Sequence, residues 1–344
     1  MPNNNVPLRR LGKNGPLVPA LGLGLMGMSI IYGKAPSDEE RFAVLDRAVE
    51  LGATNWDTSD YYGDNEELLG KWFKRTGKRD QIFLATKFGA PTAKNNKTEP
   101  DSSGAYCKEA CAASLKALGV DHIDLYYVHR ANPKIPIEET MRAMAELKAE
   151  GKIRAIGLSE ISSNTLRRAC KVVQVDAVQI EYSAFERCIE GPEGTNLLAT
   201  CRELGVAVVA YSPLGRGLLT GALNSKESVS GEGDWRSSVF PRFSGENLDA
   251  NLKLADQFKA LAEKKGCTPA QLAIAWLLRQ GEDIIPIPGT KRIKYLEENW
   301  DALQVQLTDA EVAEIRNFVE TAEIAGGRYP DQYVAQLLVD TREE

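Results

Sequence analysis

Side chains suited to acid and base chemistry stand at the ends of three apolar segments in the first part of the chain. Asp57 ends one segment and is followed by two phenols, Tyr61 and Tyr62, while Lys87 and His129 end two others. A phenol is a poor proton donor near neutrality because its usual pKa is near 10, so a nearby cation should lower that pKa. We therefore expect a proton-donating site if the fold brings these segments together. Spacing alone does not choose between the two tyrosines.

The composition argues against several classes of protein. The 344 residues are 43% hydrophobic and 26% charged, as in soluble globular proteins with one large core. A formal charge of −6 argues against a nucleic-acid partner, which would require a basic face. No run approaches the about 20 apolar residues that span a bilayer, and residues 1–5 do not begin a secretion signal. We expect a cytoplasmic protein with no membrane partner; the composition does not indicate an oligomeric state.

A metal centre is not expected from the ligand types in the sequence. The six cysteines form no Cys-x-x-Cys pair, and we expect them to be reduced. The two histidines, His122 and His129, do not form a His-Glu-x-x-His motif. Zinc sites in proteins use these residue types, so the sequence predicts no metal.

A glycine-rich stretch from Gly22 to Gly27 matches the dinucleotide-binding pattern Gly-x-Gly-x-x-Gly. In a doubly wound fold the third glycine opens a helix whose N-terminus receives the pyrophosphate. Here the next helix begins only at Ser37, which forms a capping box with Glu40. We therefore interpret these glycines as the end of a strand.

Apolar segments alternate regularly with helical patterns along most of the chain. The eight expected strands are 21–25, 53–57, 82–87, 123–129, 153–159, 177–182, 207–212 and 284–288. Strict alternation indicates parallel strands, and eight of them in about 270 residues indicate a closed (β/α)₈ TIM barrel, an α/β fold. We expect one domain over residues 1–344, with a β-hairpin at 6–21, the barrel core at about 21–300 and a C-terminal extension of helices and loops at 301–344.

Polar residues cluster at the downstream ends of these strands, the face that carries the chemistry in such barrels. They are Asp57, Lys87, His129, Ser159, Gln179, Tyr211, Ser212 and Thr290. Each one alone is as well explained by a solvated loop, but their joint placement favours one shared site.

A series of short motifs resembles the aldo-keto reductase superfamily over roughly residues 6–330. In order, the motifs are Asp57-x-x-x-x-Tyr62-Gly63, Ala85-Thr86-Lys87, Leu125-Tyr126-Tyr127-Val128-His129, Gly157-Leu158-Ser159, Val178-Gln179-x-Glu181-Tyr182, Tyr211-Ser212-Pro213-Leu214 and Ile287-Pro288-Gly289-Thr290. Tyr211 to Gly217 and Pro288 to Arg292 further resemble the microbial and plant branch described as pyridoxal reductase-like or auxin-induced-like. The resemblance implies reduction of aldehydes and ketones by NADPH.

The resemblance also implies a role for each candidate catalytic residue. The family pattern selects Tyr62 as the proton donor. Lys87 would lower its pKa, Asp57 would hold Lys87 charged, and His129 would donate a hydrogen bond to the carbonyl oxygen.

The same resemblance places the cofactor. Ser159 and Gln179 would bind the nicotinamide amide, and Tyr211 would stack on the ring. Glu160 stands where many relatives have asparagine, which weakens an expected contact. The remaining residues of the cofactor set are Gly24 and Met26; Ser212, Pro213, Leu214, Arg216 and Gly217 along the pyrophosphate; Gly289 and Thr290 at the opening of a helix; and Glu298 and Asn299 near the adenine.

Positive charge near the adenosine end decides between the two nicotinamide cofactors. Lys291, Arg292 and Lys294 stand together there. A 2′-phosphate requires positive partners and a ribose hydroxyl does not, so we expect NADPH rather than NADH.

The substrate is not determined by the sequence beyond a small carbonyl compound. We expect pocket walls from Met26, Met28, Tyr32, Phe88, Trp235, Phe240 and Phe243 and from the loops 91–103 and 215–248. The tail from Arg328 fits equally a cover over the pocket or a contact with another subunit. Two other functions stay open: an NADPH-binding regulatory or redox-sensing subunit with slow turnover, and a non-redox barrel isomerase or lyase.

Overall fold

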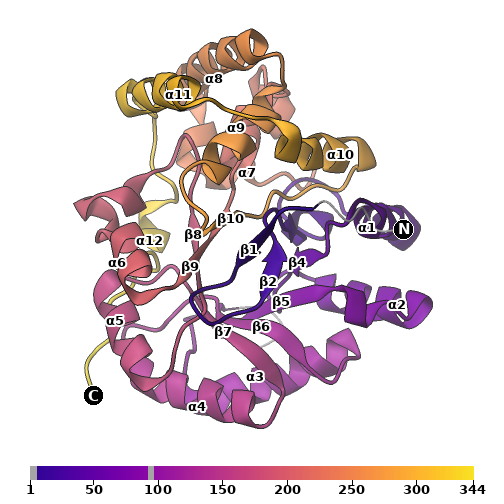
Figure 1. Cartoon of the computed structure of the whole chain (residues 1–344), viewed down its shortest axis with the longest axis vertical. Coiled ribbons are helices and arrows are strands. Elements are labelled where there is room, and N and C mark those ends of the chain that lie inside the picture. Colours follow the sequence, from indigo (N-terminus) through magenta and orange to yellow (C-terminus); the bar gives the residue numbers. More distant parts are fainter. Residues whose placement is uncertain (1–5, 92–96) are drawn as a thin grey trace.

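Eight parallel strands form the centre of the protein in a computed structural model that describes residues 6–91 and 97–344. The strands are β3 (Leu23–Gly24), β4 (Asn55–Asp57), β5 (Phe83–Phe88), β6 (Ile123–Val128), β7 (Ile153–Ser159), β8 (Ala177–Glu181), β9 (Ala207–Tyr211) and β10 (Ile284–Pro286). They are neighbours in sequence order from β3 to β10, as Figure 1 shows for β4 to β10.

The two edges of this sheet meet and close it into a barrel. The amide of Gly22 donates to the carbonyl of Pro286 at 2.9 Å, and the amide of Gly24 donates to that of Pro288 at 3.2 Å. Gly24 and Gly289 form a parallel bridge at the same seam. The predicted (β/α)₈ barrel is confirmed.

Helices follow the strands in the expected alternation and surround the barrel (Figure 1). They are α1 (Asp38–Leu51), α2 (Asn65–Thr76), α3 (Gly104–Leu118), α4 (Ile137–Ala149), α5 (Ser163–Val172), α6 (Leu197–Leu204), α7 (Arg236–Val239), α8 (Gly245–Lys265), α9 (Pro269–Leu278) and α10 (Ile293–Asp301), with α11 (Asp309–Thr321) and α12 (Asp331–Val334) after the barrel. The predicted capping box of Ser37 and Glu40 starts α1. None of the helices in the described part of the chain combines the length and apolar character required to cross a membrane.

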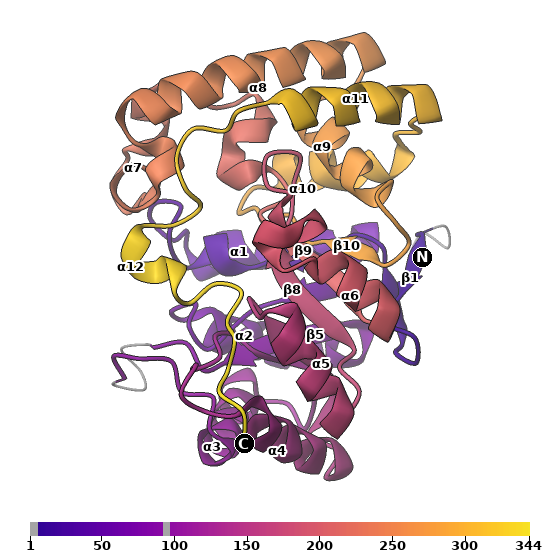
Figure 2. The same cartoon turned by 90° about the vertical axis from the view of Figure 1, so that its left-hand side faces the viewer.

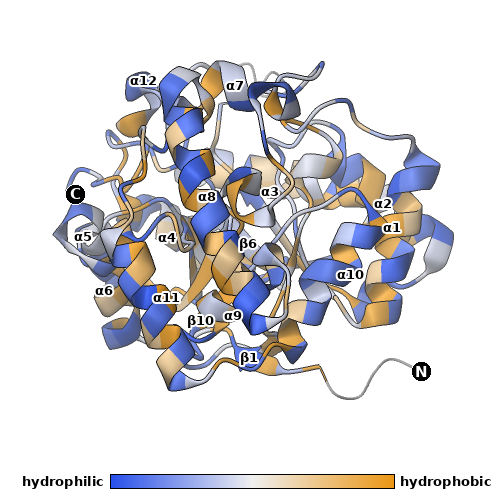
Figure 3. Cartoon of the chain, turned by 90° about the horizontal axis from the view of Figure 1, so that it is seen from above, coloured by the Kyte–Doolittle hydropathy of each residue, from blue (hydrophilic) through white to orange (hydrophobic). Residues whose placement is uncertain are grey.

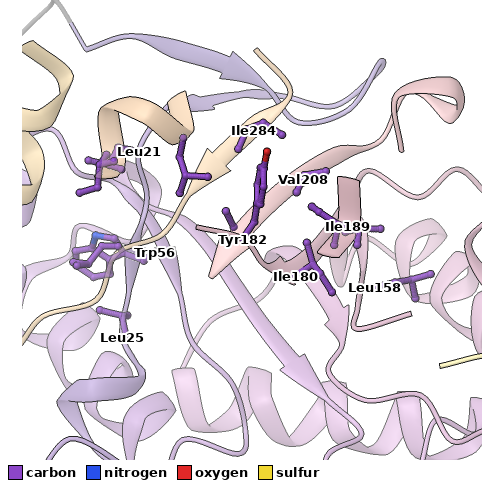
Figure 4. Packing of buried hydrophobic residues seen from close by; sticks show 14 of the residues in the cluster. Leu21, Leu25, Trp56, Leu158, Ile180, Tyr182, Ile189, Val208 and Ile284 are labelled. Atoms are coloured by element: carbon purple, nitrogen blue, oxygen red, sulfur yellow. The ribbon is translucent and has the colours of Figure 1, made fainter. Parts of the chain in front are cut away.

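Two separate apolar clusters stabilise the barrel. The larger one lies between the strands and the helices, where Trp56, Ile180 and Val208 are fully buried (Figure 4). The outer helices are amphipathic, and Figure 3 shows hydrophilic and hydrophobic residues side by side on α8 and α11. The smaller cluster fills the barrel interior with Ala85, Leu125, Tyr127, Ala155, Ala177, Ala207, Val209, Ile285 and Ile287.

The predicted N-terminal hairpin consists of β1 (Leu8–Arg10) and β2 (Leu17–Pro19), and it closes the end of the barrel at which the strands begin. Its Leu11 and Val18 side chains belong to the interior cluster. Arg9 donates hydrogen bonds to the carbonyls of Leu278 and of Ile284, the first residue of β10. The opposite end, where the strands terminate, stays available for a site.

The segment after α11 runs back along the side of the barrel (Figure 2). It passes through α12 and reaches the end of β7, where Val339 forms a parallel bridge with Ile161. The described part of the tail therefore packs against its own chain, and a contact of the tail with another subunit stays a prediction.

Candidate active site

Strand alternation explains why the polar residues meet inside the barrel. Side chains two residues apart point to the same face of a strand, so Lys87 shares the interior face with Ala85. His129 continues the interior row of Leu125 and Tyr127 in the same way. Ser159, Gln179 and Tyr211 likewise follow the interior residues Ala155, Ala177 and Val209.

Lys87 is the centre of the catalytic group and is fully buried. Its ammonium donates to Asp57 Oδ1 at 2.5 Å, to the Thr58 carbonyl at 2.7 Å and to the Tyr62 hydroxyl at 3.3 Å. The other Asp57 oxygen accepts from Gln179 Nε2 at 2.7 Å. Burial lowers the pKa of Lys87, but the charges of Asp57 and Tyr62 and the hydrogen bonds to both residues together raise that pKa above its usual value. Lys87 is therefore a fixed cation facing the phenol.

Tyr62 lies at this site with 7% of its surface exposed. Burial raises the pKa of Tyr62, the charge of Lys87 lowers it and the charge of Asp57 raises it again, and the net direction is upward. Lys87 therefore lowers the pKa of Tyr62, as predicted, but burial outweighs this effect, so the phenol is not more acidic than usual in the cavity as described. A phenol that keeps its proton remains available to donate it.

His129 is an uncharged imidazole beside the two tyrosines. Burial, with the charges of Arg130 and Lys87, holds the pKa of His129 well below its usual value. Its Nδ1 lies 3.0 Å from the Ser59 hydroxyl, and the His129 ring meets the Tyr62 ring edge to face at 5.8 Å. A neutral imidazole bound at Nδ1 by a hydroxyl can present Nε2–H as a hydrogen-bond donor.

Three of the four predicted catalytic residues line one cavity of about 950 Å³ at the end of the barrel, and Lys87 is buried outside its lining. Asp57, Tyr62 and His129 line one end of it, and Lys291 and Arg292 line another part. Of the predicted cofactor residues, those in the lining are Gly24, Met26, Ser159, Gln179, Tyr211, Ser212, Pro213, Leu214, Arg216, Gly217, Gly289, Thr290, Lys291 and Arg292. Such a volume is near the upper end for small-molecule sites.

Four predicted cofactor residues lie outside this lining. Lys294, Glu298 and Asn299 are on α10, and Glu160 is fully buried after β7. Their contacts with a cofactor stay predictions.

The region before α10 differs from the expected helix opening. The helix begins at Ile293, so Gly289 and Thr290 belong to the preceding loop and do not open it. The Lys291 ammonium donates to the backbone carbonyls of Tyr32 at 2.7 Å and Lys34 at 3.0 Å. Lys291 thus fastens a neighbouring loop while its charge stays in the cavity wall.

Arg216 is already engaged with protein groups. It donates to the Tyr329 hydroxyl at 2.8 Å, lies 3.6 Å from a Glu181 oxygen and stacks over the Phe240 ring at 4.2 Å. A phosphate partner would add to these contacts or replace some of them.

The predicted substrate walls are correct in part. Met26, Tyr32, Trp235 and Phe240 line the cavity. The prediction is wrong for Met28, Phe88 and Phe243, because each of these side chains is almost completely buried in the outer apolar cluster. In the predicted loop 91–103, residues 92–96 lie outside the described part of the chain.

The motifs did not single out several lining residues. Arg130 directly follows His129 and donates to its carbonyl at 2.7 Å. Tyr329, Tyr333, Gln336 and Leu337 come from the tail. The position of Arg130 directly after a strand-end histidine could have predicted it as a cavity residue. The tail contains no local sequence pattern that predicts a cavity wall.

The placement of the His, Cys, Asp and Glu side chains bears on whether a metal ion could bind. No group of three or more His, Cys, Asp or Glu side chains within residues 6–91 and 97–344 is placed to hold an ion. The predicted catalytic group consists of a phenol, a lysine, an imidazole and a carboxylate.

Comparison with known proteins agrees with this fold. The Aldo/keto reductase family model matches residues 20–320. The chain therefore belongs to the aldo/keto reductase family and is an oxidoreductase of that class.

Two curated relatives are similar over nearly the whole chain. The NADP(+) aldo-keto reductase yakc of Schizosaccharomyces pombe is 49% identical over 346 residues, covering 98% of each chain. The aldo-keto reductase str7 of Strobilurus tenacellus is 49% identical over 343 residues, again covering 98% of each. Among solved structures, the glycerol dehydrogenase of Gluconobacter oxydans is 28% identical with a TM-score of 0.78, covering 92% of this chain and 95% of its own.

Proposed function

We propose that this chain reduces aldehydes or ketones to alcohols with NADPH, and that Tyr62 donates the proton. The observation that carries the proposal is the hydrogen bond from Lys87 Nζ to the Tyr62 hydroxyl at the wall of the large cavity. A buried phenol next to a fixed cation suits protonation of a developing alkoxide.

The cavity lining has the chemistry that a nicotinamide dinucleotide requires. Ser159 and Gln179 offer polar groups beside the catalytic residues, and Tyr211 offers an aromatic face. Arg216 and Arg292 supply positive charge suited to phosphates. The bound cofactor would supply the hydride. The name of the yeast relative, which specifies NADP(+), supports the same choice.

Each catalytic residue then has one physical task. Asp57 keeps Lys87 charged, and Lys87 stabilises the phenolate that Tyr62 becomes after it gives up its proton. His129 donates from Nε2 to the carbonyl oxygen and orients it toward the phenol. Tyr62 is chosen over Tyr61 because its hydroxyl is the one that contacts Lys87.

The preference for NADPH rests on Arg292 and on the charge of Lys291. Both line the cavity beside Tyr295 and Thr290. Two cations placed together favour a phosphate over a neutral hydroxyl, so they favour NADP(H).

Turnover with a panel of carbonyl compounds tests the proposal. NADPH oxidation is followed by absorbance with aromatic, aliphatic and pyridine aldehydes, dicarbonyls and ketones. Tyr62→Phe should lower kcat by roughly 10²-fold or more while the Kd for NADPH changes less than about threefold. Tyr61→Phe is the matched control and should retain most of the turnover. If Tyr62→Phe retains wild-type turnover, the proton donor is another group.

The same assay separates the two alternative functions. A regulatory subunit would bind NADPH and complete about one turnover, whereas an isomerase or lyase would not bind it. The pyridine aldehydes in the panel test the resemblance to the pyridoxal reductase-like branch.

A further inference from the structure

The tail contributes a buried arginine to the region behind the nicotinamide end of the cavity. Arg328 Nη2 donates to Glu160 Oε1 at 2.5 Å and to the Tyr211 hydroxyl at 3.1 Å. Its Nε donates to Glu181 Oε2 at 3.2 Å. The side chain of Arg328 is 10% exposed, and that of Glu160 is 0% exposed. This is a charge network closed off from solvent.

Glu160 is the residue that most needs this arginine. It directly follows Ser159 at the end of β7, in a left-handed conformation with φ of 51°. Its carboxylate would be a costly buried charge without a cation beside it. Arg328 supplies that cation from a distant part of the sequence.

Tyr211 links the pair to the cavity. Its hydroxyl donates to Glu160 Oε1 at 2.7 Å, while the residue itself lines the cavity. Burial and then the charge of Glu160 raise the pKa of Tyr211 well above its usual value, so the phenol keeps its proton and remains the donor. The orientation of the Tyr211 ring thus depends on a carboxylate that Arg328 holds.

The backbone fastens the tail at the same place. The amide of Val339 donates to the Glu160 carbonyl at 3.0 Å, and the amide of Ser162 donates to the Val339 carbonyl at 3.1 Å. Figure 2 shows the tail passing α12 and descending along the barrel. Glu160 is therefore held through its side chain by one part of the tail and through its backbone by another.

We propose that Arg328 is a positioning residue for the cofactor: it neutralises Glu160, and Glu160 then holds the Tyr211 ring as the wall for the nicotinamide. This inference rests on the proposed function, in which Tyr211 stacks on that ring. The tail is then part of the cofactor site and more than a cover.

Direct binding of NADPH to the full chain tests the proposal. Kd is measured from quenching of tryptophan fluorescence for the wild type, Arg328→Met, Glu160→Gln and the double variant. Arg328→Met should raise Kd about tenfold or more, because it leaves a buried carboxylate without a cation. The double variant should bind within about threefold of Glu160→Gln, since a neutral side chain no longer needs the arginine.

Controls separate positioning from general loss of structure. Arg316→Met removes another arginine of the C-terminal region, which pairs with Glu190 at 2.7 Å, and should leave Kd within about twofold of the wild type. Arg328→Lys keeps the charge and should recover most of the affinity if the Met variant folds poorly. In Arg328→Met the KM for NADPH should rise more than kcat falls, because the Lys87 group is untouched.

Two results would overturn the positioning role. One is an Arg328→Met variant that binds NADPH less than fivefold more weakly than the wild type. The other is a double variant that binds NADPH more than about threefold more weakly than Glu160→Gln. In both cases carbonyl reduction by the wild type stands. If the wild type does not bind NADPH, the proposed function and this inference fail together.

Discussion

The predicted catalytic end of the cavity, around Lys87 and Tyr62, and its predicted cofactor end, around Arg216 and Lys291, are built by different means. At the catalytic end, Asp57 and Lys87 lie on the neighbouring strands β4 and β5 and form a hydrogen-bonded ion pair. At the cofactor end, Arg216 and Lys291 sit on loops and bond groups far away in the sequence. Strands set positions through the sheet register, whereas loops rely on whichever partners the fold brings near.

This difference suggests different behaviour when a cofactor binds. The Lys87 group has its donors and acceptors paired within the barrel and needs no rearrangement to act. Arg216 and Lys291 already have protein partners, so binding a phosphate exchanges contacts as well as adding them.

Removing the buried cation should have the largest effect. Lys87→Met leaves Asp57 without its charge partner and Tyr62 without its neighbouring cation, so kcat should fall on the order of 10²- to 10³-fold. Unfolding in urea should show a loss of about 3 kcal/mol. Lys71→Met, at an exposed lysine paired with Asp38, is the control and should change neither. A variant with wild-type turnover would remove Lys87 from the mechanism.

The next largest effect should come from packing beneath the site. A Cβ added at Gly157 would lie 2.2 Å from the Tyr127 ring inside the barrel. Gly157→Ala should therefore reduce the free energy of unfolding by roughly 3 kcal/mol, measured by urea denaturation. Gly191→Ala is the matched control, because a Cβ there meets nothing within 4 Å. Equal stability of the two variants would mean that the strand shifts without cost.

A moderate effect is expected at the cofactor end. Arg292→Met should raise the KM for NADPH about tenfold and leave that for NADH within about twofold, because a 2′-phosphate loses a charged partner. Lys294 is two residues further along the chain and lies outside the cavity lining. Lys294→Met should therefore raise the KM for NADPH less than about threefold. Equal responses of the two variants, or an equal rise for both cofactors, would contradict the assignment of Arg292.

The smallest effect should be a change in the pH dependence of stability. Burial, and next the charge of Glu66, raise the pKa of Asp60 to about 7. Between about pH 4 and this value the folded protein holds a proton that the unfolded chain has lost. The stabilising contribution is therefore complete below about pH 4 and is lost as the pH rises toward about 7.

Asp60→Asn should flatten that decline in the free energy of unfolding, measured by urea denaturation at several pH values. Asp249→Asn, at an exposed position of α8, is the control and should keep the wild-type slope. A variant of Asp60 with the wild-type slope would place the titration elsewhere.

The sequence predicted the barrel and the catalytic end well for a physical reason. Strand alternation and helix caps are local signals: β7 (Ile153–Ser159) matches the expected bounds, and the expected capping box of Ser37 and Glu40 opens α1. Lys87 and Asp57 end neighbouring strands, so parallel order alone brings them together. The direction of the Tyr62 pKa was not predicted, because the extent of burial depends on the whole cavity.

The loop-built end was harder to predict from local patterns. Gly289 and Thr290 matched a helix opening in sequence, yet the helix begins at Ile293. Lys291 was expected near a phosphate; it lines the cavity, and its ammonium also donates to the carbonyls of Tyr32 and Lys34. These partners are more than 250 residues away, and no local pattern reports them.

By itself, the sequence determined the order of strands and helices and the residue that ends each strand, because both follow from short-range periodicity. Tertiary structure alone decided how far those end groups are buried and where the tail lies. Glu160 illustrates both cases. Its position directly after the strand-end residue Ser159 follows from the sequence, but its ion pair with Arg328 forms only because the tail folds back against β7. Contacts of that kind are set by the packing of the whole barrel, which is why they appear only in three dimensions.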